Sequence, residues 1–136
     1  MASILEYNSA LDIIEIVLTG YITAADLKEI TSKGIALSKE KGVLAVVIDA
    51  TEMVLGASIT DIFDLPDKQY VDEDLDHRIR VGLVVPKLPS EKKAAQFYED
   101  ACVNRGWRVR SFPNRDGAVE WLKRAVSSNK PDAGNG

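Results

Sequence analysis

Residues that hold metals and form disulfides are scarce in this chain of 136 residues, which has one cysteine and one histidine. A single cysteine excludes an internal disulfide and any metal site built from several thiolates. A single histidine excludes the common sites in which several imidazoles bind one zinc ion. We therefore expect no metal site and no cofactor.

Long apolar segments are also missing. No stretch approaches the roughly 18 consecutive apolar residues that indicate a membrane-spanning helix. The N-terminus lacks the basic segment followed by an apolar one that is typical of a signal peptide. The net charge of −4 argues against non-specific binding to nucleic acid. We expect a cytoplasmic protein that neither inserts into membranes nor binds nucleic acid.

The common catalytic signatures are absent as well. The sequence has no glycine-rich phosphate loop and no nucleophile elbow. His77 has no nucleophile near it in the sequence, and we expect it to be an exposed loop residue. Cys102 lies on an apolar helix stripe, where a thiol behaves as a small hydrophobic group. These observations favour a protein that is not an enzyme.

A run of six apolar residues, 43–48, is the strongest structural signal in the chain. It is preceded by Lys41-Gly42 and ended by Asp49, which predicts a strand buried on both faces of a sheet. Shorter or alternating apolar runs predict four more strands, at 4–7, 11–19, 79–85 and 107–112. Gly20 is expected to end the second of the five.

Helix start and stop signals lie between these strands. The predicted N-caps are Thr23, Ser58, Ser90 and Asn114, and the predicted stops are Gly42, Pro66 and Gly106. The resulting order, ββαβαβαβα, predicts an α/β fold with a mixed, mostly parallel five-stranded sheet and four helices. We expect one domain over residues 1–126 and a disordered tail over 127–136.

Several short motifs carry a family resemblance through their order and spacing. They are Gly20 with Ala25-Asp26-Leu27, Val46-Val47-Ile48-Asp49, Asn104-Arg105-Gly106-Trp107, and Ala118 with Trp121-Leu122. With them the chain resembles the STAS domain superfamily over residues 3–126, most closely the uncharacterised SpoIIAA-like branch related to bacterial anti-sigma-factor antagonists. The resemblance implies a regulatory module that binds a protein partner.

The resemblance also implies a phosphorylation site. In the antagonists a strand ends in Asp, a loop follows, and a helix opens on a phosphorylatable Ser beside an Asp. Asp49 and Ser58 match the strand-end Asp and the helix-opening Ser in position, whereas Ala57 replaces the neighbouring Asp. From the residues alone, Ser58 is either a helix cap or a phosphate switch, and Asp49 either bonds the turn or contacts a ligand.

The segment after the buried strand is the expected functional surface, because ligands meet open α/β sheets beyond the carboxyl ends of the strands. Its candidate partner- or ligand-binding residues are Asp49, Met53, Val54, Leu55, Ser58, Ile59, Ile62 and Phe63. Met53, Val54 and Leu55 either cover the core or form an exposed apolar lip.

A second candidate surface consists of arginines late in the chain, Arg78, Arg80, Arg108 and Arg110. They either balance the acidic segment 67–76 or form an anion-binding patch.

Two functional hypotheses follow. The first is a non-enzymatic module that binds an unknown protein partner through the segment Asp49–Phe63. The alternative is a carrier or sensor of a small apolar or anionic ligand in a pocket beside the second helix. A homodimer through a sheet edge or the exposed loop is also compatible with the sequence.

Overall fold

The computed structural model describes residues 2–128 and contains one five-stranded sheet. The strands are β1 (Ala2–Asn8), β2 (Ile13–Thr23), β3 (Ala45–Gly56), β4 (Arg80–Val84) and β5 (Arg108–Phe112). They lie in sequence order across the sheet. The β1–β2 hairpin is antiparallel and the other three pairings are parallel, which confirms the predicted sheet.

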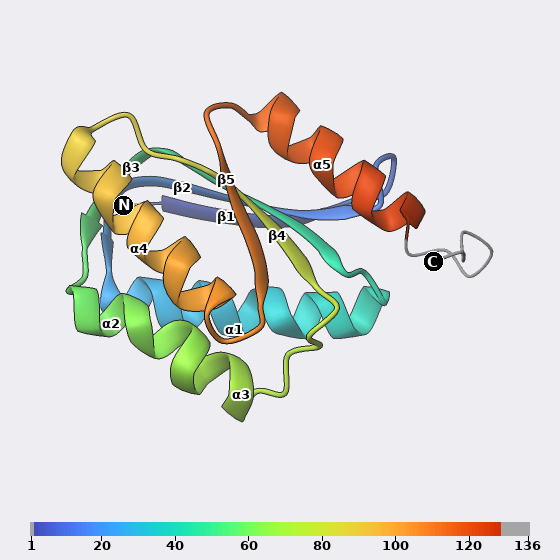
Figure 1. Cartoon of the computed structure of the whole chain (residues 1–136), viewed down its shortest axis with the longest axis horizontal. Helices are drawn as coiled ribbons and strands as arrows, with labels where there is room; N and C mark the ends of the chain where they lie inside the picture. Colours follow the sequence, from blue (N-terminus) through green and yellow to red (C-terminus); the bar gives the residue numbers. More distant parts are fainter. Residues whose placement is uncertain (1, 129–136) are drawn as a thin grey trace.

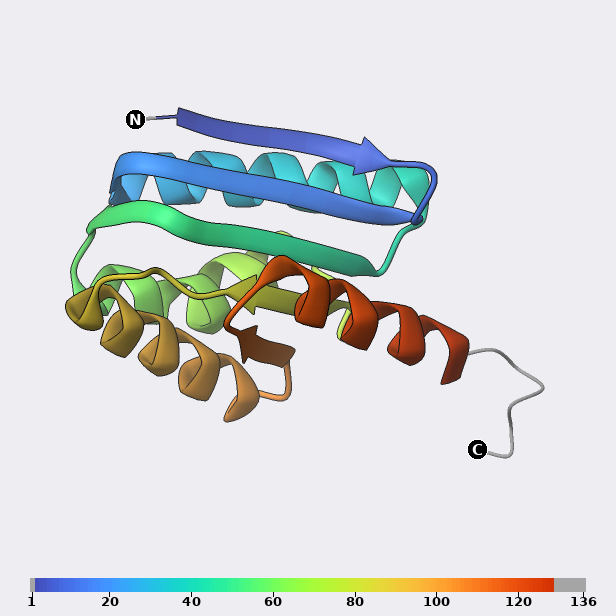
Figure 2. The same ribbon diagram turned by 90° about the horizontal axis from the view of Figure 1, so that it is seen from above.

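The helices form two layers on opposite faces of this sheet (Figures 1 and 2). One layer consists of α1 (Ala24–Lys41), the continuous helical segment α2–η1–α3 (Ile59–Asp64, Leu65–Gln69 and Tyr70–Asp72) and α4 (Pro89–Val103). The other layer is α5 (Arg115–Ser128) alone. We call the two sides of the sheet the α1 face and the α5 face.

Each face has its own apolar core. On the α1 face, Ile14, Ile16 and Leu18 of β2 are buried against the helices. On the α5 face, Ile13, Ala45 and Val47 pack with Ala118 and Leu122 of α5. Because successive side chains of a strand point to opposite faces, a strand between the two layers must be apolar throughout. This requirement explains why residues 45–48 are all apolar. Val43 and Leu44 precede β3 and pack in the core of the α1 face.

Both central strands are longer than predicted. β2 continues past Gly20 to Thr23, and β3 continues past Asp49 to Gly56. The two extensions pair with each other beyond a register shift between Val17 and Thr19. Gly20 has a φ of 73°, a left-handed conformation that glycine adopts without strain. It therefore lets β2 continue where we expected the strand to end.

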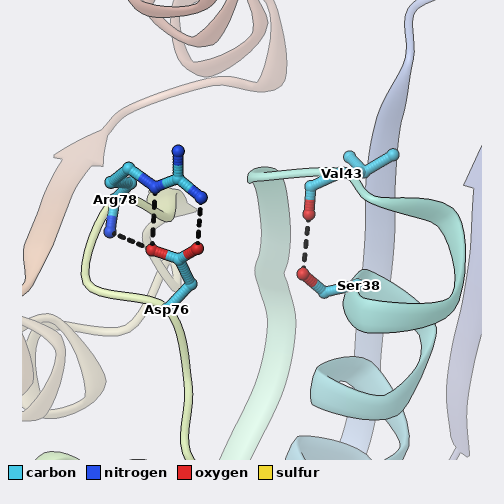
Figure 3. A network of polar contacts seen from close by, with 4 residues as sticks. All are labelled: Ser38, Val43, Asp76 and Arg78. Carbon is cyan, nitrogen blue, oxygen red and sulfur yellow. Dashed lines mark hydrogen bonds and ion pairs between the residues drawn. The ribbon is translucent and has the colours of Figure 1, made fainter.

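The ends of α1 follow the sequence signals. Thr23 Oγ1 accepts a hydrogen bond from the backbone N–H of Asp26 at 3.1 Å, and Asp26 Oδ2 accepts one from Thr23 N–H at 2.9 Å. Gly42 is left-handed, with a φ of 66°. The buried Ser38 hydroxyl then donates to the Val43 carbonyl oxygen at 2.6 Å (Figure 3), which joins the end of α1 to the segment that leads into β3.

Two helix predictions were wrong. Pro66 does not end the second helix, because the wider π-helical turn η1 accommodates it and the helical segment continues to Asp72. Ser90 is not the N-cap of α4, since that helix begins at Pro89 after Leu88. Proline suits this first position because its φ is already helical and no N–H is lost from the helix.

The last helix, α5, begins as the sequence predicts and extends two residues beyond the predicted domain boundary at 126. Asn114 Oδ1 accepts from the N–H of Gly117 at 2.9 Å, as expected for an N-cap. α5 extends to Ser128, and the rest of the predicted tail, 129–136, lies outside the described residues. No helix within 2–128 combines the length and apolar character needed to cross a membrane. The same residues contain no metal-ligating cluster of His, Cys, Asp and Glu.

Candidate functional site

The end of β3 alternates between the two faces, which answers whether 53–55 is a core or a surface segment. Met53 and Leu55 point to the α1 face and pack against the core. Val54 points to the α5 face, where α5 does not reach, and is 43% exposed. The expected apolar loop is therefore a strand, and only its middle residue is available to a partner.

Further exposed apolar residues accompany Val54 at this end of the molecule. Tyr21 is opposite Val54 in the β2–β3 register and is 57% exposed. Ile59 begins α2 and is 51% exposed, and Leu88 precedes α4 and is 50% exposed. Figure 1 shows the end of β3 and the starts of α2 and α4 on the same side of the molecule. We call Tyr21, Val54, Ile59 and Leu88 the apolar end.

Polar contacts fix the strands and helices that carry the apolar end. The Leu55 N–H donates to Glu91 Oε1 of α4. The Lys87 ammonium lies 2.6 Å from Glu52 Oε2 and joins the β4–α4 connection to β3. Sequence analysis missed Tyr21, Leu88 and Glu91. Tyr21 was missed because we expected β2 to end at Gly20, whereas the strand continues to Thr23.

Ser58 forms a complete capping box at the start of α2. Its Oγ accepts from the Asp61 N–H at 3.1 Å and donates to Asp61 Oδ2 at 2.9 Å. Asp61 Oδ2 also accepts from the Ser58 N–H at 3.0 Å. The backbone hydrogen bond, followed by the hydroxyl bond, lowers the pKa of the Asp61 carboxyl. Ser58 is exposed, so its hydroxyl is both a helix cap and accessible to solvent.

Asp49 lies apart from Ser58, because β3 continues for seven residues, about 23 Å of strand, beyond it. Its Oδ1 accepts hydrogen bonds from the N–H of Thr51, at 3.0 Å, and from the Thr51 hydroxyl. These bonds agree with the structural alternative for Asp49, a carboxylate that satisfies the local backbone. They lie where β3 shifts its register against β2.

An apolar cavity of about 90 Å³ lies on the α1 face, between the sheet and the helices. Met53, Leu55 and Ile62 line it, together with Tyr70 and Tyr98, whose hydroxyls hydrogen-bond to each other. Two of the candidate binding residues, Ile59 and Phe63, do not line this cavity. Ile59 is exposed, and the Phe63 ring packs 4.0 Å from the Arg105 guanidinium carbon and 6.4 Å from the Phe97 ring.

The arginines do not form a single group. Arg78 Nη2 lies 2.7 Å from Asp76 Oδ2 (Figure 3), and this pairing lowers the pKa of the Asp76 carboxyl to about 2. Arg80, Arg108 and Arg110 lie instead on the α5 face of β4 and β5. Arg80 is opposite Arg108 in the register, and Arg110 is opposite Gly82.

His77 and Cys102 occupy non-catalytic settings. The exposed His77 imidazole stacks on the Trp107 indole, with ring centroids 3.8 Å apart and planes 8° apart. Cys102 is completely buried, and burial raises the pKa of its thiol to about 12. A thiol that stays protonated cannot act as a nucleophile near neutral pH.

Comparisons with known proteins place this geometry in a fold. Neither the models of protein families nor the curated proteins include a match. Among solved structures, an uncharacterized protein of the DUF3478 family with a SpoIIAA-like fold, from Shewanella loihica PV-4, is 17% identical to this chain with a TM-score of 0.55. That match covers 89% of this chain and 92% of the other.

Two structures of SpoIIAA are similar to the same degree. The anti-sigma factor antagonist SpoIIAA in its unphosphorylated form is 16% identical, over 90% of this chain and 98% of that one, with a TM-score of 0.55. The Bacillus cell fate determinant SpoIIAA in its phosphorylated form is 17% identical, over 89% and 99%, with the same TM-score. The chain therefore has the SpoIIAA-like fold that its sequence motifs predicted.

Proposed function

We propose, starting from this SpoIIAA-like fold, that the chain is a non-enzymatic regulatory module that binds a protein partner through the apolar end. The observation that carries the proposal is the gathering of exposed apolar side chains where β3 ends and where α2 and α4 begin. Exposed apolar groups of this kind mark interaction sites when they occur together.

The partner contacts Val54 and Ile59 directly in this proposal, whereas Met53 and Leu55 support them from the core. The two exposed side chains can be changed without opening the interior, because neither contributes to the buried clusters. Substitution of Met53 or Leu55 would confuse loss of binding with loss of packing. The informative variants are therefore Val54→Asp and Ile59→Asp.

Affinity capture from cells that naturally contain the protein tests this proposal. We expect one stoichiometric partner with the wild-type chain and loss of that partner with Val54→Asp and Ile59→Asp. Val71→Asp and Val103→Asp are matched controls, since Val71 and Val103 are 60% and 52% exposed but lie outside the apolar end. A partner that the controls lose equally, or that the test variants retain, would refute the proposed surface.

The apolar cavity favours a second candidate function, the binding of a small apolar ligand. The cavity volume of about 90 Å³ is below the roughly 150 Å³ that holds benzene in an engineered cavity. A ligand as large as benzene therefore requires the helices to move apart. Organic extraction and mass spectrometry of the purified protein test this candidate. Ala94 lines the cavity, and the larger side chain of Ala94→Leu would occupy part of it. A ligand that the wild type retains and Ala94→Leu loses supports this function. A wild-type protein without a ligand counts against it.

A further inference from the structure

A group of arginines on the α5 face does not belong to the proposed partner surface. Arg80 begins β4, and Arg108 and Arg110 belong to the edge strand β5. All three point to the face that α5 covers, because the intervening Val81 and Val109 are buried in the core of the α1 face. The group therefore lies across the sheet from α1–α4. It is also separate from the apolar end, because Arg80 pairs with Ala45 at the start of β3, nine residues before Val54.

Two of these arginines are direct cross-strand neighbours. Arg80 and Arg108 are partners in the parallel register, and neighbouring strands lie about 4.8 Å apart. Like charges placed directly opposite each other destabilise a sheet. Burial, and then the charge of Arg108, lowers the pKa of the Arg80 guanidinium. The fold thus places two positive charges side by side.

Two carboxylates near these strands, Asp76 and Glu99, have other partners. Asp76 pairs with Arg78, and Glu99 Oε1 accepts from the backbone N–H of Ser111 at 3.0 Å. Among residues 2–128, Arg108 and Arg110 form no ion pair, whereas Arg78, Arg105 and Arg115 each have one. Both unpaired arginines are exposed, although the chain as a whole carries a net charge of −4. Arg80, Arg108 and Arg110 therefore form a local positive patch on the α5 face of a negatively charged chain.

Aromatic side chains border the patch on the side of α5. The Arg110 guanidinium carbon lies 5.7 Å from the centre of the Phe112 ring, and the Phe112 ring lies 5.6 Å from that of Trp121. Packing between Phe112 and Trp121 joins the end of β5 to α5. The backbone that carries Arg108 and Arg110 is thus held by both the sheet and a helix.

We propose that Arg80, Arg108 and Arg110 form a binding site for a phosphate monoester. A guanidinium presents a planar fork of donors that matches phosphate oxygens. A carboxylate carries one charge, whereas a phosphate monoester carries nearly two charges and three strong acceptor oxygens. One phosphate group can therefore accept hydrogen bonds from two neighbouring guanidiniums and balance nearly two positive charges, whereas a carboxylate balances one. The ester is either a free phosphorylated metabolite or a phosphorylated side chain of another protein.

Calorimetric titration of the full chain with O-phosphoserine, at constant ionic strength, tests the site. We expect saturable binding that weakens about tenfold or more in Arg108→Gln, because a charge-assisted hydrogen bond is lost. Arg78→Gln is the matched control: it removes the same charge from an exposed residue close by, and we expect less than about a twofold change. Absence of saturable binding, or equal weakening by both variants, would overturn the proposal.

Two further ligands identify the chemistry and the source of the ester. A peptide containing phosphoserine that binds more tightly than O-phosphoserine assigns the site to a phosphorylated protein, whereas equal binding assigns it to a small molecule. A peptide with glutamate in place of phosphoserine must bind more weakly, and equal binding would overturn the choice of phosphate. The titration uses the purified chain alone, so its outcome is independent of the partner proposed for the apolar end.

Discussion

At the scale of single residues, Ser58 shows how a candidate functional group also serves the fold. Its hydroxyl is both donor and acceptor in the capping box with Asp61. This cap satisfies the N–H of Asp61, one of the N–H groups in the first turn of the six-residue helix α2 that have no partner within the helix. A modification of the Ser58 oxygen would remove its donated hydrogen bond and place new charge beside the Asp61 carboxylate.

Replacement of Ser58 by alanine should therefore destabilise the protein even if no partner is present. We expect the free energy of unfolding to fall by about 1 kcal/mol, the usual cost of losing an N-cap side chain. Urea denaturation followed by circular dichroism measures this change. Thr60→Ala is the control, since Thr60 is exposed in the same helix and makes no cap. Equal stability of Ser58→Ala and wild type would show that the cap contributes nothing.

Single residues also show what sequence could and could not predict. The capping boxes at Thr23 and Ser58 were predictable, because the hydroxyl and the carboxylate three residues later are local in sequence. The exposure of Tyr21 and Val54 was not, because it depends on pairing between two strand extensions across a register shift. Gly20 and Asp49 carry signals typical of strand ends, yet tertiary pairing overrides them.

At the scale of elements, the contact between α5 and the sheet depends on the absence of a side chain at Gly82. A Cβ at this position would lie 3.0 Å from the Ala118 Cβ and 3.5 Å from its Cα. The Cα and Cβ atoms of Ala118 are fixed to the backbone of α5, so they can move only if the helix moves. The close approach keeps Ala118 and Leu122 buried over β3 and β4.

Gly82→Ala should consequently cost about 1–3 kcal/mol of stability, the usual range for an overpacked core. Thermal or urea unfolding measures this cost. Gly56→Ala is an informative comparison, because its new methyl group would meet the exposed Tyr21 ring, which can rotate into solvent. A smaller loss for Gly82→Ala than for Gly56→Ala would contradict the close packing of α5 on the sheet.

The helical segment α2–η1–α3 shows the limit of sequence rules at this scale. Pro66 normally ends a helix because it lacks an N–H and collides with the preceding turn. Here the wider turn of η1 accommodates it, and the Pro66 carbonyl accepts from Trp107 Nε1–H at 3.3 Å. That partner is 41 residues away, so no local signal in the sequence could reveal it.

At the scale of the whole molecule, one ion pair ties α5 to the β1–β2 hairpin. Arg115 donates to both carboxylate oxygens of Glu15, at 3.0 and 2.7 Å, and the Asn8 amide donates to Glu15 as well. The bonds from Arg115 are the main cause that lowers the pKa of the Glu15 carboxyl. A lowered folded-state pKa means that this stabilisation is present above the unfolded value and is lost as pH falls through the folded value.

Replacement of Glu15 by glutamine should therefore reduce stability most near neutral pH. We expect a loss of about 1–2 kcal/mol at pH 7 that shrinks as pH falls below about 4.3, the usual pKa of glutamate. Unfolding curves over this pH range check the expectation. Glu29→Gln is the control, since its pair with Lys33 is exposed on both sides. A difference between wild type and Glu15→Gln that does not change with pH would refute the assigned cause.

The overall architecture was predictable because all five strands and several helix ends carry local signals, such as the apolar run at 43–48 and the left-handed cap at Gly106, whose φ is 86°. The candidate functional surface was only partly predictable. Val54 and Ile59 were included among its residues, but Tyr21 and Leu88 join them through the fold alone. Tyr21 lies 33 residues before Val54, and Leu88 lies 29 residues after Ile59, so no local pattern connects them.

Photo-crosslinking inside cells that naturally contain the protein tests the central claim most directly. A photoreactive residue at Val54 or Ile59 should give one discrete adduct with a partner protein. The same residue at Val71 or Val103, which are more exposed than Val54 and Ile59 but lie outside the apolar end, should give none. Adducts at the control positions alone, or no adduct at any of the four, would contradict the assignment of the apolar end as the partner-binding surface.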